Sequence, residues 1–178
     1  MKIQKCREVK TPTRAYIGDA GIDFYVPVFK EDFVIDLCKK NNIDIDIKDL
    51  DTNVAYDGKI FLYDAVILKP NERILIPSGI KIKLDNNNTY LRLANKSGVS
   101  TKKGLDVLAG VIDFSYCGEI HISLVNTSNK NVAIQQNEKI IQGIITPCIY
   151  ESIDVVDNID IEGDRGEKAF GSTDSLDI

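Results

Sequence analysis

The chain has 178 residues, a length that fits one domain with a sizeable buried core. Its 22 Lys and Arg residues are outnumbered by 27 Asp and Glu residues, and the formal charge of -5 disfavours a protein that tracks nucleic-acid phosphates. No apolar run reaches the length of a membrane span and the N-terminus holds no apolar signal region, so we expect an intracellular, soluble protein with reduced cysteines, located in a cytoplasm or, for a viral protein, in the host cytoplasm.

The first predicted element is a strand in the sequence DAGIDFY, residues 19–25, with Asp23 inside it. Residues 28–64 then depart from the strand pattern. Their first part, KEDFVIDLCKKNN, predicts a short helix because its apolar residues fall on one face. These apolar residues are Phe33, Val34, Leu37 and Cys38. Either Asn41 or Asn42 is expected to close the helix in a left-handed conformation, and IDIDIKDLD, residues 43–51, alternates like a half-exposed strand.

Strand patterns dominate the rest of the chain. In RILIPSGIKIKL, residues 73–84, apolar and polar residues alternate on both sides of a Pro-Ser-Gly turn. The further strand-like runs are YLRLA, EIHISLVN, NVAIQ and KIIQGIITPCIY, and clusters of Asn, Asp and Ser form turns between them. Many short strands joined by polar turns predict an all-β barrel or sandwich.

One stretch, AGVIDFSYCGEI at residues 109–120, predicts a hairpin with the Asp113 carboxylate beside its tip. The backbone groups of a hairpin can read a flat base edge as a neighbouring strand would, and a carboxylate placed there can deprotonate a water. From these residues alone, an aspartate that only shapes the turn is the simpler interpretation.

Three further patches carry groups that suit an anion. NKSGVS, residues 95–100, predicts a short Ser-Gly turn that presents N–H groups and a hydroxyl to phosphate oxygens, although such a turn also simply joins two strands. Gln142 in NEKIIQG, residues 137–143, is by itself an ordinary sheet residue. The tail DRGEKAFGSTD, residues 164–174, combines cationic and hydroxyl groups, which suits either a flap that orders over a polyphosphate or a disordered tail.

Together with DAGIDFY, these four patches resemble, in this order, the five motifs of the trimeric dUTPase family. The resemblance implies one dUTPase-like domain over residues 1–178, an all-β distorted jelly-roll barrel, and a homotrimer with shared active sites. It implies hydrolysis of dUTP to dUMP and pyrophosphate, with Mg²⁺ held mainly by substrate phosphates and water and by no direct protein ligand. Residues 28–64 exceed the family's usual link at this point, so we interpret them as a helix-and-strand insertion and as a surface for a protein partner. Residues 164–178 are interpreted as a flexible C-terminal arm.

The resemblance also implies a role for individual residues. Asp113 activates the water that attacks the α-phosphorus, Tyr116 packs against the deoxyribose, and Asp23 helps to organise the site. The backbone around Ala109, Gly110 and Val111 contacts the uracil. The remaining substrate-binding residues that it implies are Lys96, Ser97, Gly98 and Gln142 on the phosphates, Arg165 on the γ-phosphate, Phe170 over the uracil, and Gly171, Ser172 and Thr173 in the arm.

The chain departs from the family pattern at four places. Lys96 stands where the family has an arginine, Ser115 where it has a second aspartate, Cys117 before the hairpin glycine, and Lys168-Ala169 where the arm has a glycine pair. Lysine keeps the charge of arginine but loses its bidentate fork. Two alternatives stay open beside a dUTPase: a dCTP deaminase-related enzyme, and a dUTPase-fold regulatory or moonlighting protein that binds a partner through residues 28–64.

Overall fold

The computed structural model describes residues 1–44, 54–56, 59–62 and 64–159, and in these ranges the chain forms thirteen strands and two helices. The first elements are β1 (Lys2–Lys5), β2 (Gly21–Tyr25), α1 (Glu31–Lys40), β3 (Val54–Tyr56), β4 (Lys59–Leu62), β5 (Ala65–Leu68), β6 (Arg73–Pro77) and β7 (Ile80–Lys83). The later ones are β8 (Thr89–Asn95), α2 (Ser97–Lys103), β9 (Leu105–Ala109), β10 (Val111–Ile112), β11 (His121–Asn126), β12 (Val132–Gln135) and β13 (Lys139–Pro147).

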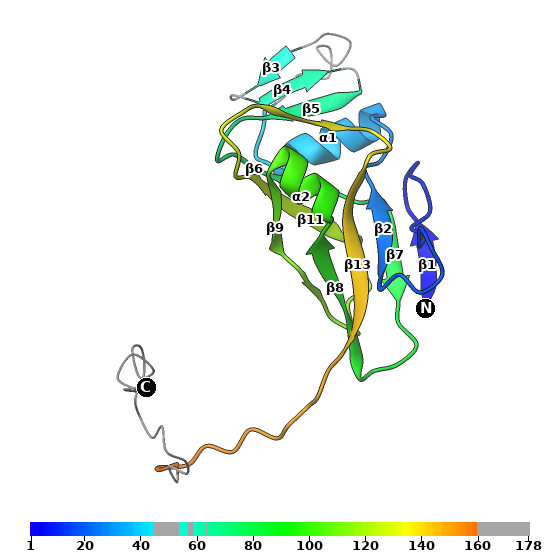
Figure 1. Ribbon diagram of the computed structural model, residues 1–178, viewed down its shortest axis with the longest axis vertical. Helices are drawn as coiled ribbons and strands as arrows, with labels where there is room; N and C mark the ends of the chain where they lie inside the picture. Colours follow the sequence, from blue (N-terminus) through cyan, green and yellow to red (C-terminus); the bar gives the residue numbers. More distant parts are fainter. Residues whose placement is uncertain (45–53, 57–58, 63, 160–178) are drawn as a thin grey trace, which may run out of the picture.

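The paired strands are all antiparallel and form four small sheets (Figure 1). The strand orders are β10-β8-β13-β2, β6-β11-β9, β12-β5-β4-β3 and β1-β7. The predicted Pro-Ser-Gly turn separates β6 from β7, and it carries the chain from one sheet to another, with Gly79 at a φ of 73°. Short antiparallel strands that switch between sheets confirm the expected all-β class.

The core lies between these sheets because alternate strand residues point inward. In β11, Ile122 and Leu124 are buried, and their neighbours His121 and Ser123 are only partly so. The largest fully buried side chains are Phe24, Phe33, Leu37, Leu68, Ile74, Ile76, Ile80, Leu91, Leu105, Ile120, Ile122 and Leu124. Each such side chain contributes about 1.5–3 kcal/mol to stability through its removal from water.

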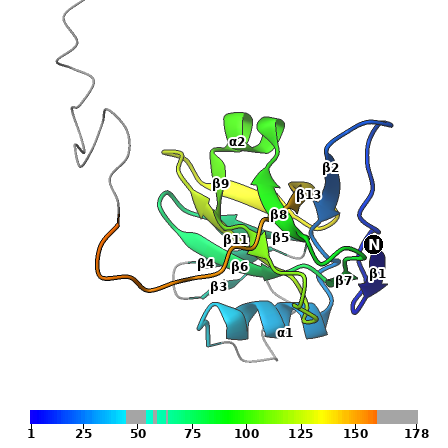
Figure 2. The ribbon, with the colours of Figure 1, turned by 90° about the horizontal axis from the view of Figure 1, so that it is seen from below.

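The predicted helix at the start of residues 28–64 is confirmed as α1, and it is part of this core. Its four expected apolar residues are the ones that the structure buries, and α1 packs on the opposite side of the strands from α2 (Figure 2). The helix ends at Lys40 with Asn41 as its C-cap, and the next asparagine, Asn42, takes the left-handed conformation with a φ of 54°. The Asn41 side-chain amide bonds both the N–H and the C=O of Leu75, at 2.8 and 2.9 Å, and so fixes α1 to β6.

The remainder of residues 28–64 adds strands to one sheet. Strands β3 and β4 extend the sheet that β5 and β12 begin. Most of the strand predicted at residues 43–51 lies outside the described residues, and its first residue, Ile43, is buried directly after the helix.

The predicted Ser-Gly turn at residues 95–100 is wrong, because the chain forms helix α2 there. The Thr101 hydroxyl donates to the Ser97 carbonyl, and Gly104 closes the helix in the left-handed conformation with a φ of 69°. None of its seven residues is buried, so this helix leaves no apolar periodicity in the sequence. No helix in the described ranges combines the length and the apolar character needed to cross a membrane.

The predicted hairpin at residues 109–120 also differs from the structure. Strand β10 pairs with β8, and β9 pairs with β11, so the two halves of the motif belong to different sheets. Gly110 makes this crossing possible, since a Cβ there would lie 2.8 Å from the Leu93 carbonyl oxygen. The motif is therefore a loop between two sheets rather than a two-stranded hairpin.

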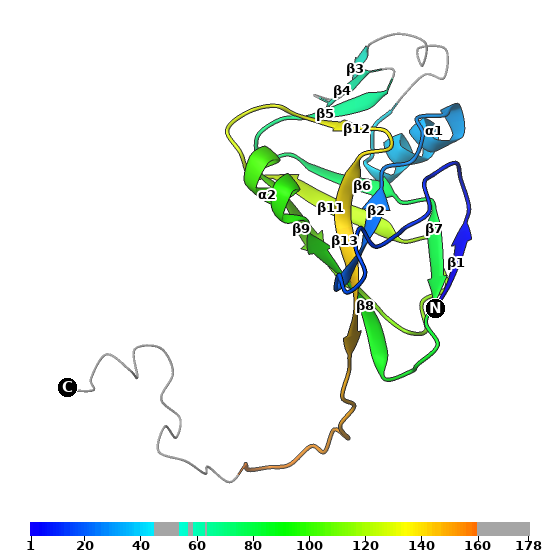
Figure 3. The ribbon, with the colours of Figure 1, turned by 45° about the vertical axis from the view of Figure 1, so that its right-hand side comes forward.

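The chain leaves the body of the molecule after β13. Residues 148–159 run outward without regular secondary structure (Figures 1 and 3). Their apolar side chains are strongly exposed, and the exposed fractions of Ile153 and Val155 reach 93% and 97%. Such a run of unburied apolar side chains is unfavourable in a lone chain and favours contact with another one.

Candidate functional site

The residues predicted to form a site gather in two clusters. One, which we call the lysine corner, consists of Asp23, Lys96, Ser97, Gly98 and Gln142. The other, which we call the aspartate loop, runs from residue 109 to residue 119 and contains Asp113 and Tyr116. The predicted arm residues Arg165, Phe170, Gly171, Ser172 and Thr173 lie outside the described residues.

Asp23 is the centre of the lysine corner. It lies in β2 with only 5% of its surface exposed, and its carboxylate accepts a hydrogen bond from the Lys96 ammonium. The Lys139 ammonium lies 2.8 Å from its second oxygen. Burial alone would raise the pKa of the Asp23 carboxyl, but the hydrogen bonds and charges of Lys139 and Lys96 lower it below the ordinary value. The corner therefore holds an ionised carboxylate between two cations.

Lys139 is a member of this corner that the sequence analysis missed. It lies inside the NEKIIQG patch, where the period of the strand gives no sign that its ammonium reaches back to β2. Gln142, in the same strand, was predicted to belong to the site. Gln142 pairs with Asp23 across β13 and β2, and its side-chain amide donates to the Asn95 carbonyl at 2.8 Å.

Gln142 is also held from its other side. A Cβ at Gly21 would lie 2.4 Å from the Gln142 side-chain oxygen, so only glycine leaves room for this side chain. The amide group is thus fixed beside the start of α2, where Ser97 and Gly98 are exposed. Together, these residues place a lysine charge, a hydroxyl and an amide on one exposed edge of the molecule.

The aspartate loop begins at the close approach of Gly110 to β8. The Leu93 N–H donates to the Gly110 carbonyl at 2.7 Å, and the Asp113 carboxylate follows β10 in an exposed position. The Tyr116 N–H donates to the Asp113 carbonyl at 3.1 Å, which closes a turn. The carboxylate and the ring therefore project from the same short turn.

The Tyr116 ring lies against Gly118. A Cβ at Gly118 would lie 2.5 Å from the Tyr116 hydroxyl oxygen, and this hydroxyl donates to the Glu119 carbonyl at 2.8 Å. The ring keeps 42% of its surface exposed, so one face is available to a ligand. Ala109 and Val111 are exposed at the start of the same loop.

One chain does not bring the Asp113 carboxylate next to the lysine corner. Ile112 pairs with Leu91, so Asp113 falls opposite Tyr90 near the start of β8, whereas Lys96 follows the end of that strand. The six residue steps from position 90 to position 96 span about 20 Å of extended strand. The start of the aspartate loop is closer to the corner, because Gly110 contacts Leu93.

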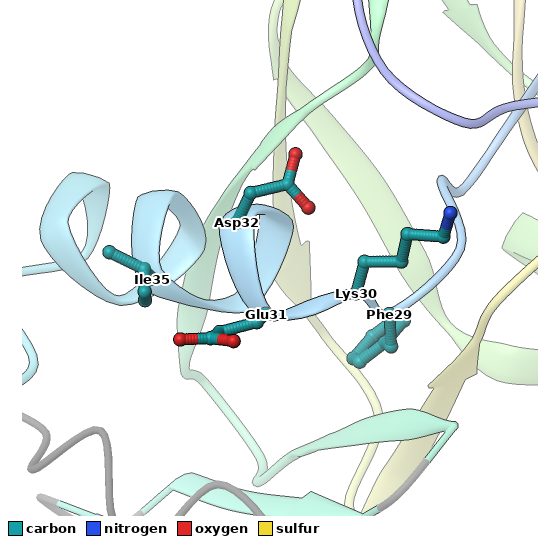
Figure 4. A pocket seen from close by; sticks show the side chains of 5 residues that line it. All are labelled: Phe29, Lys30, Glu31, Asp32 and Ile35. Carbon is teal, nitrogen blue, oxygen red and sulfur yellow. The ribbon is translucent and has the colours of Figure 1, made fainter.

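Two hollows of the described surface lie away from these clusters. A shallow pocket of about 620 Å³ surrounds the first turn of α1, and Figure 4 shows its lining by Phe29, Lys30, Glu31, Asp32 and Ile35. A second pocket, of about 480 Å³, lies between the end of α2 and the start of β12. Neither includes a predicted site residue.

Comparisons with known proteins agree with the motifs. The sequence model of the dUTPase family matches residues 53–174. The deoxyuridine 5'-triphosphate nucleotidohydrolase of Hahella chejuensis is 33% identical over 142 residues, which are 79% of this chain and 93% of the relative. The enzyme of that name from Clostridium novyi is 38% identical over 116 residues, 64% of this chain and 80% of its own.

Solved structures share the fold. The Staphylococcus bacteriophage 80alpha dUTPase with dUPNHPP aligns with a TM-score of 0.68 at 20% identity, over 97% of this chain and 96% of that one. A D95N variant of the phage phi11 dUTPase, described as coordinating a structural Mg(II) ion, aligns with a TM-score of 0.63 at 17% identity, over 89% of this chain and 97% of that one.

Proposed function

The chain belongs to the dUTPase family and is a dUTP diphosphatase, and we propose that a water held by Asp113 attacks the α-phosphorus of dUTP. In one chain Asp113 and Lys96 lie near opposite ends of β8, about 20 Å apart along the strand. This separation, together with the trimeric assembly that the family resemblance implies, supports an active homotrimer in which one subunit supplies Asp113 and a neighbour supplies the lysine corner.

The exposed Asp113 carboxylate is suited to general base catalysis. It accepts a proton from the water as the water oxygen forms a bond to the α-phosphorus. The bond from that phosphorus to the bridging oxygen of the β-phosphate breaks, pyrophosphate leaves, and dUMP remains. The proton on Asp113 then returns to solvent.

The aspartate loop also selects the nucleoside. The backbone of Ala109, Gly110 and Val111 offers hydrogen-bonding groups to the uracil edge, and a mismatched base would leave buried polar groups unpaired. The exposed face of the Tyr116 ring lies one turn from Asp113 and packs against the deoxyribose. A 2′-hydroxyl would meet this ring, so UTP is disfavoured.

The lysine corner binds the phosphates. Lys96 and Lys139 place two ammonium groups around one buried carboxylate, so the corner carries a net positive charge toward a ligand. The Lys96 ammonium already donates one hydrogen bond to Asp23. This bond orients the ammonium, and its remaining donors are available to phosphate oxygens. Ser97 and Gln142 add a hydroxyl and an amide next to it.

We expect Mg²⁺ to bind at this site through the substrate. Phosphate oxygens and water are the hard oxygen donors that this ion prefers. When bound, the ion neutralises charge on the phosphates and on the departing pyrophosphate.

The exposed segment 148–159 supports the trimer. Its apolar side chains are strongly exposed to solvent in one chain, and the segment precedes the predicted arm at 164–178. Contact with a neighbouring subunit removes this surface from water and carries the arm to a shared site. Arg165 there contacts the γ-phosphate, Phe170 covers the uracil, and Gly171, Ser172 and Thr173 hold phosphate.

Pyrophosphate release tests this proposal. Purified protein with Mg²⁺ is given dUTP, dCTP, dTTP and UTP in turn, and the Asp113→Asn variant serves as the matched control. We expect release from dUTP alone, and its loss in the variant. Release from dCTP with formation of a uracil base would favour the deaminase-related enzyme, and no release from any nucleotide would contradict the proposal.

A second, regulatory role through residues 28–64 stays a hypothesis, and it needs a different test from deletion of the segment. Because α1 contributes Phe33 and Leu37 to the core, its removal would expose the core and obscure any other effect. Charge reversal of the exposed Glu31 and Asp32, which line the pocket on α1, changes only the surface. Loss of a copurifying partner with unchanged dUTP turnover would support the second role.

A further inference from the structure

An ion pair joins the aspartate loop to the N-terminal segment of the chain. The Arg7 guanidinium donates from Nε to Glu119 Oε1 at 2.8 Å and from Nη2 to Glu119 Oε2 at 2.7 Å. The two side chains are only 13% and 14% exposed. This bidentate, largely buried geometry is the strong form of an arginine–carboxylate pair and fixes the distance between the two segments.

The same guanidinium also reaches the helix of residues 28–64. Arg7 Nη2 lies 2.6 Å from Asp36 Oδ2 in α1, and its Cζ atom lies 5.9 Å from the centre of the Phe33 ring. One side chain thus contacts α1 by charge and by stacking while it holds Glu119. The position of α1 and the position of the loop are coupled through Arg7.

Glu119 passes this constraint to Tyr116. Its Oε1 atom accepts a hydrogen bond from the Gly79 N–H at 2.6 Å, which anchors the side chain to the turn between β6 and β7. The backbone carbonyl of Glu119 accepts a hydrogen bond from the Tyr116 hydroxyl. The residue that receives Arg7 is therefore also the residue that orients the ring.

Backbone contacts hold the loop at both of its ends. Strand β10 pairs with β8 on one side, and the buried Ile120 exchanges backbone hydrogen bonds with Ser78 and Ile80 on the other. Between these ends, Asp113, Ser115, Tyr116 and Cys117 are exposed, and Phe114 is only partly buried against the core. The Arg7–Glu119 pair is the side-chain contact that acts closest to the Tyr116 ring. A catalytic loop is held to within about 0.5 Å only when its supporting contacts are rigid.

We propose that the Arg7–Glu119 pair is a positioning device for Tyr116, that Asp36 ties it to α1, and that the discrimination between deoxyribose and ribose depends on it. The proposal rests on the function proposed above. The function proposed above places none of Arg7, Glu119 and Asp36 on the nucleotide, so we assign them a role through the placement of the ring.

The test compares kcat/KM for dUTP with kcat/KM for UTP in three variants. Arg7→Met keeps most of the volume but removes the charge, Glu119→Gln removes the acceptor charge, and Asp36→Asn loosens only the tie to α1. We expect the dUTP-to-UTP ratio to fall about tenfold in the first two, as a displaced ring admits the 2′-hydroxyl. A smaller fall in the same direction is expected for Asp36→Asn.

A matched control separates this effect from a general loss of charge. Lys30→Met removes the surface pair with Glu8, whose members are 60% and 58% exposed and which does not reach the loop. The ratio of kcat/KM for dUTP to kcat/KM for UTP in this variant should equal that of the unaltered protein. In addition, Tyr116→Phe combined with Arg7→Met should lower the ratio no further than the larger single effect, because both changes act on one ring.

Hydrogen exchange makes the test independent of turnover. Arg7→Met should speed amide exchange in the peptide spanning residues 113–120 while leaving that of α2, at 97–103, unchanged. If the unaltered protein releases no pyrophosphate from dUTP, the proposed function fails but this exchange result still decides the positioning role. A folded Arg7→Met protein with unchanged exchange and an unchanged nucleotide ratio would overturn the inference.

Discussion

Substitution of Gly110 by alanine should separate catalysis from folding. A Cβ at this position would lie 2.8 Å from the Leu93 carbonyl oxygen, a backbone atom that cannot rotate away. Ordinary contact begins at 3.4 Å, so the start of β10 must move by about 0.6 Å. Asp113 lies three residues further along the same backbone and is carried with it.

We expect Gly110→Ala to affect the stability of the protein and its catalytic activity to different extents. Overpacking at one contact destabilises by about 1–3 kcal/mol, which a domain of this size survives at room temperature. A displacement of this size at the catalytic base approaches the misplacement of 1 Å that costs about a hundredfold, so we expect kcat/KM for dUTP to fall roughly tenfold to a hundredfold.

The assay is pyrophosphate release with a urea denaturation curve on the same protein. Ile74→Val serves as the control, because truncation of this fully buried residue of β6, which lies outside the loop, should lower the free energy of unfolding by about 0.5–1.5 kcal/mol. It should keep its kcat/KM. Full activity in Gly110→Ala, or an equal loss in Ile74→Val, would refute the claim that the contact with β8 positions Asp113.

Two further predictions concern stability. Phe33→Ala in α1 should lower the free energy of unfolding by about 3–5 kcal/mol in urea melts, because a fully buried ring leaves a cavity; a loss below about 1 kcal/mol would mean that α1 is peripheral. Burial would raise the pKa of the Glu119 carboxyl, but Arg7 and the Gly79 N–H lower it below its ordinary value of 4.5. The Arg7–Glu119 pair therefore stabilises the folded state fully above that value, and this contribution should disappear as pH falls through the lowered pKa of the folded state. In thermal melts at stepped pH, the melting temperature of Glu119→Gln should fall less steeply on the acid side than that of the unaltered protein.

The sequence predicted what depends on short-range periodicity. The apolar face of α1 follows from a 3.6-residue repeat, and the strands β6 and β11 follow from alternation, because each element has one face in the core. Either Asn41 or Asn42 was expected in the left-handed conformation because asparagine tolerates it, and Asn42, with a φ of 54°, is the one that adopts it.

Features without such a repeat were missed or mistaken. Helix α2 has no buried residue, so nothing in its composition distinguishes it from a turn. The pairing of β10 with β8 depends on a contact between two distant parts of the chain, at Gly110 and Leu93.

Ion pairs between distant residues are equally hidden from sequence spacing. Arg7 and Glu119 are 112 positions apart, and Lys96 and Asp23 are 73 positions apart. Of these four residues, Lys96 and Asp23 were found through their motifs. Arg7 and Glu119 carry no pattern of their own, because an isolated arginine or glutamate usually lies on the surface.

Subunit complementation tests the shared site most directly. Asp113→Asn removes the proposed base, and Ser97→Glu places a negative charge where the phosphates should bind, at an exposed helix start that tolerates an acid. Each variant alone should be inactive toward dUTP. When the two are coexpressed and mix at random, about one site in four combines an intact loop with an intact corner from different subunits, and about a quarter of the normal activity should return. Trimers of mixed composition that stay inactive would contradict a site built from two copies of the chain.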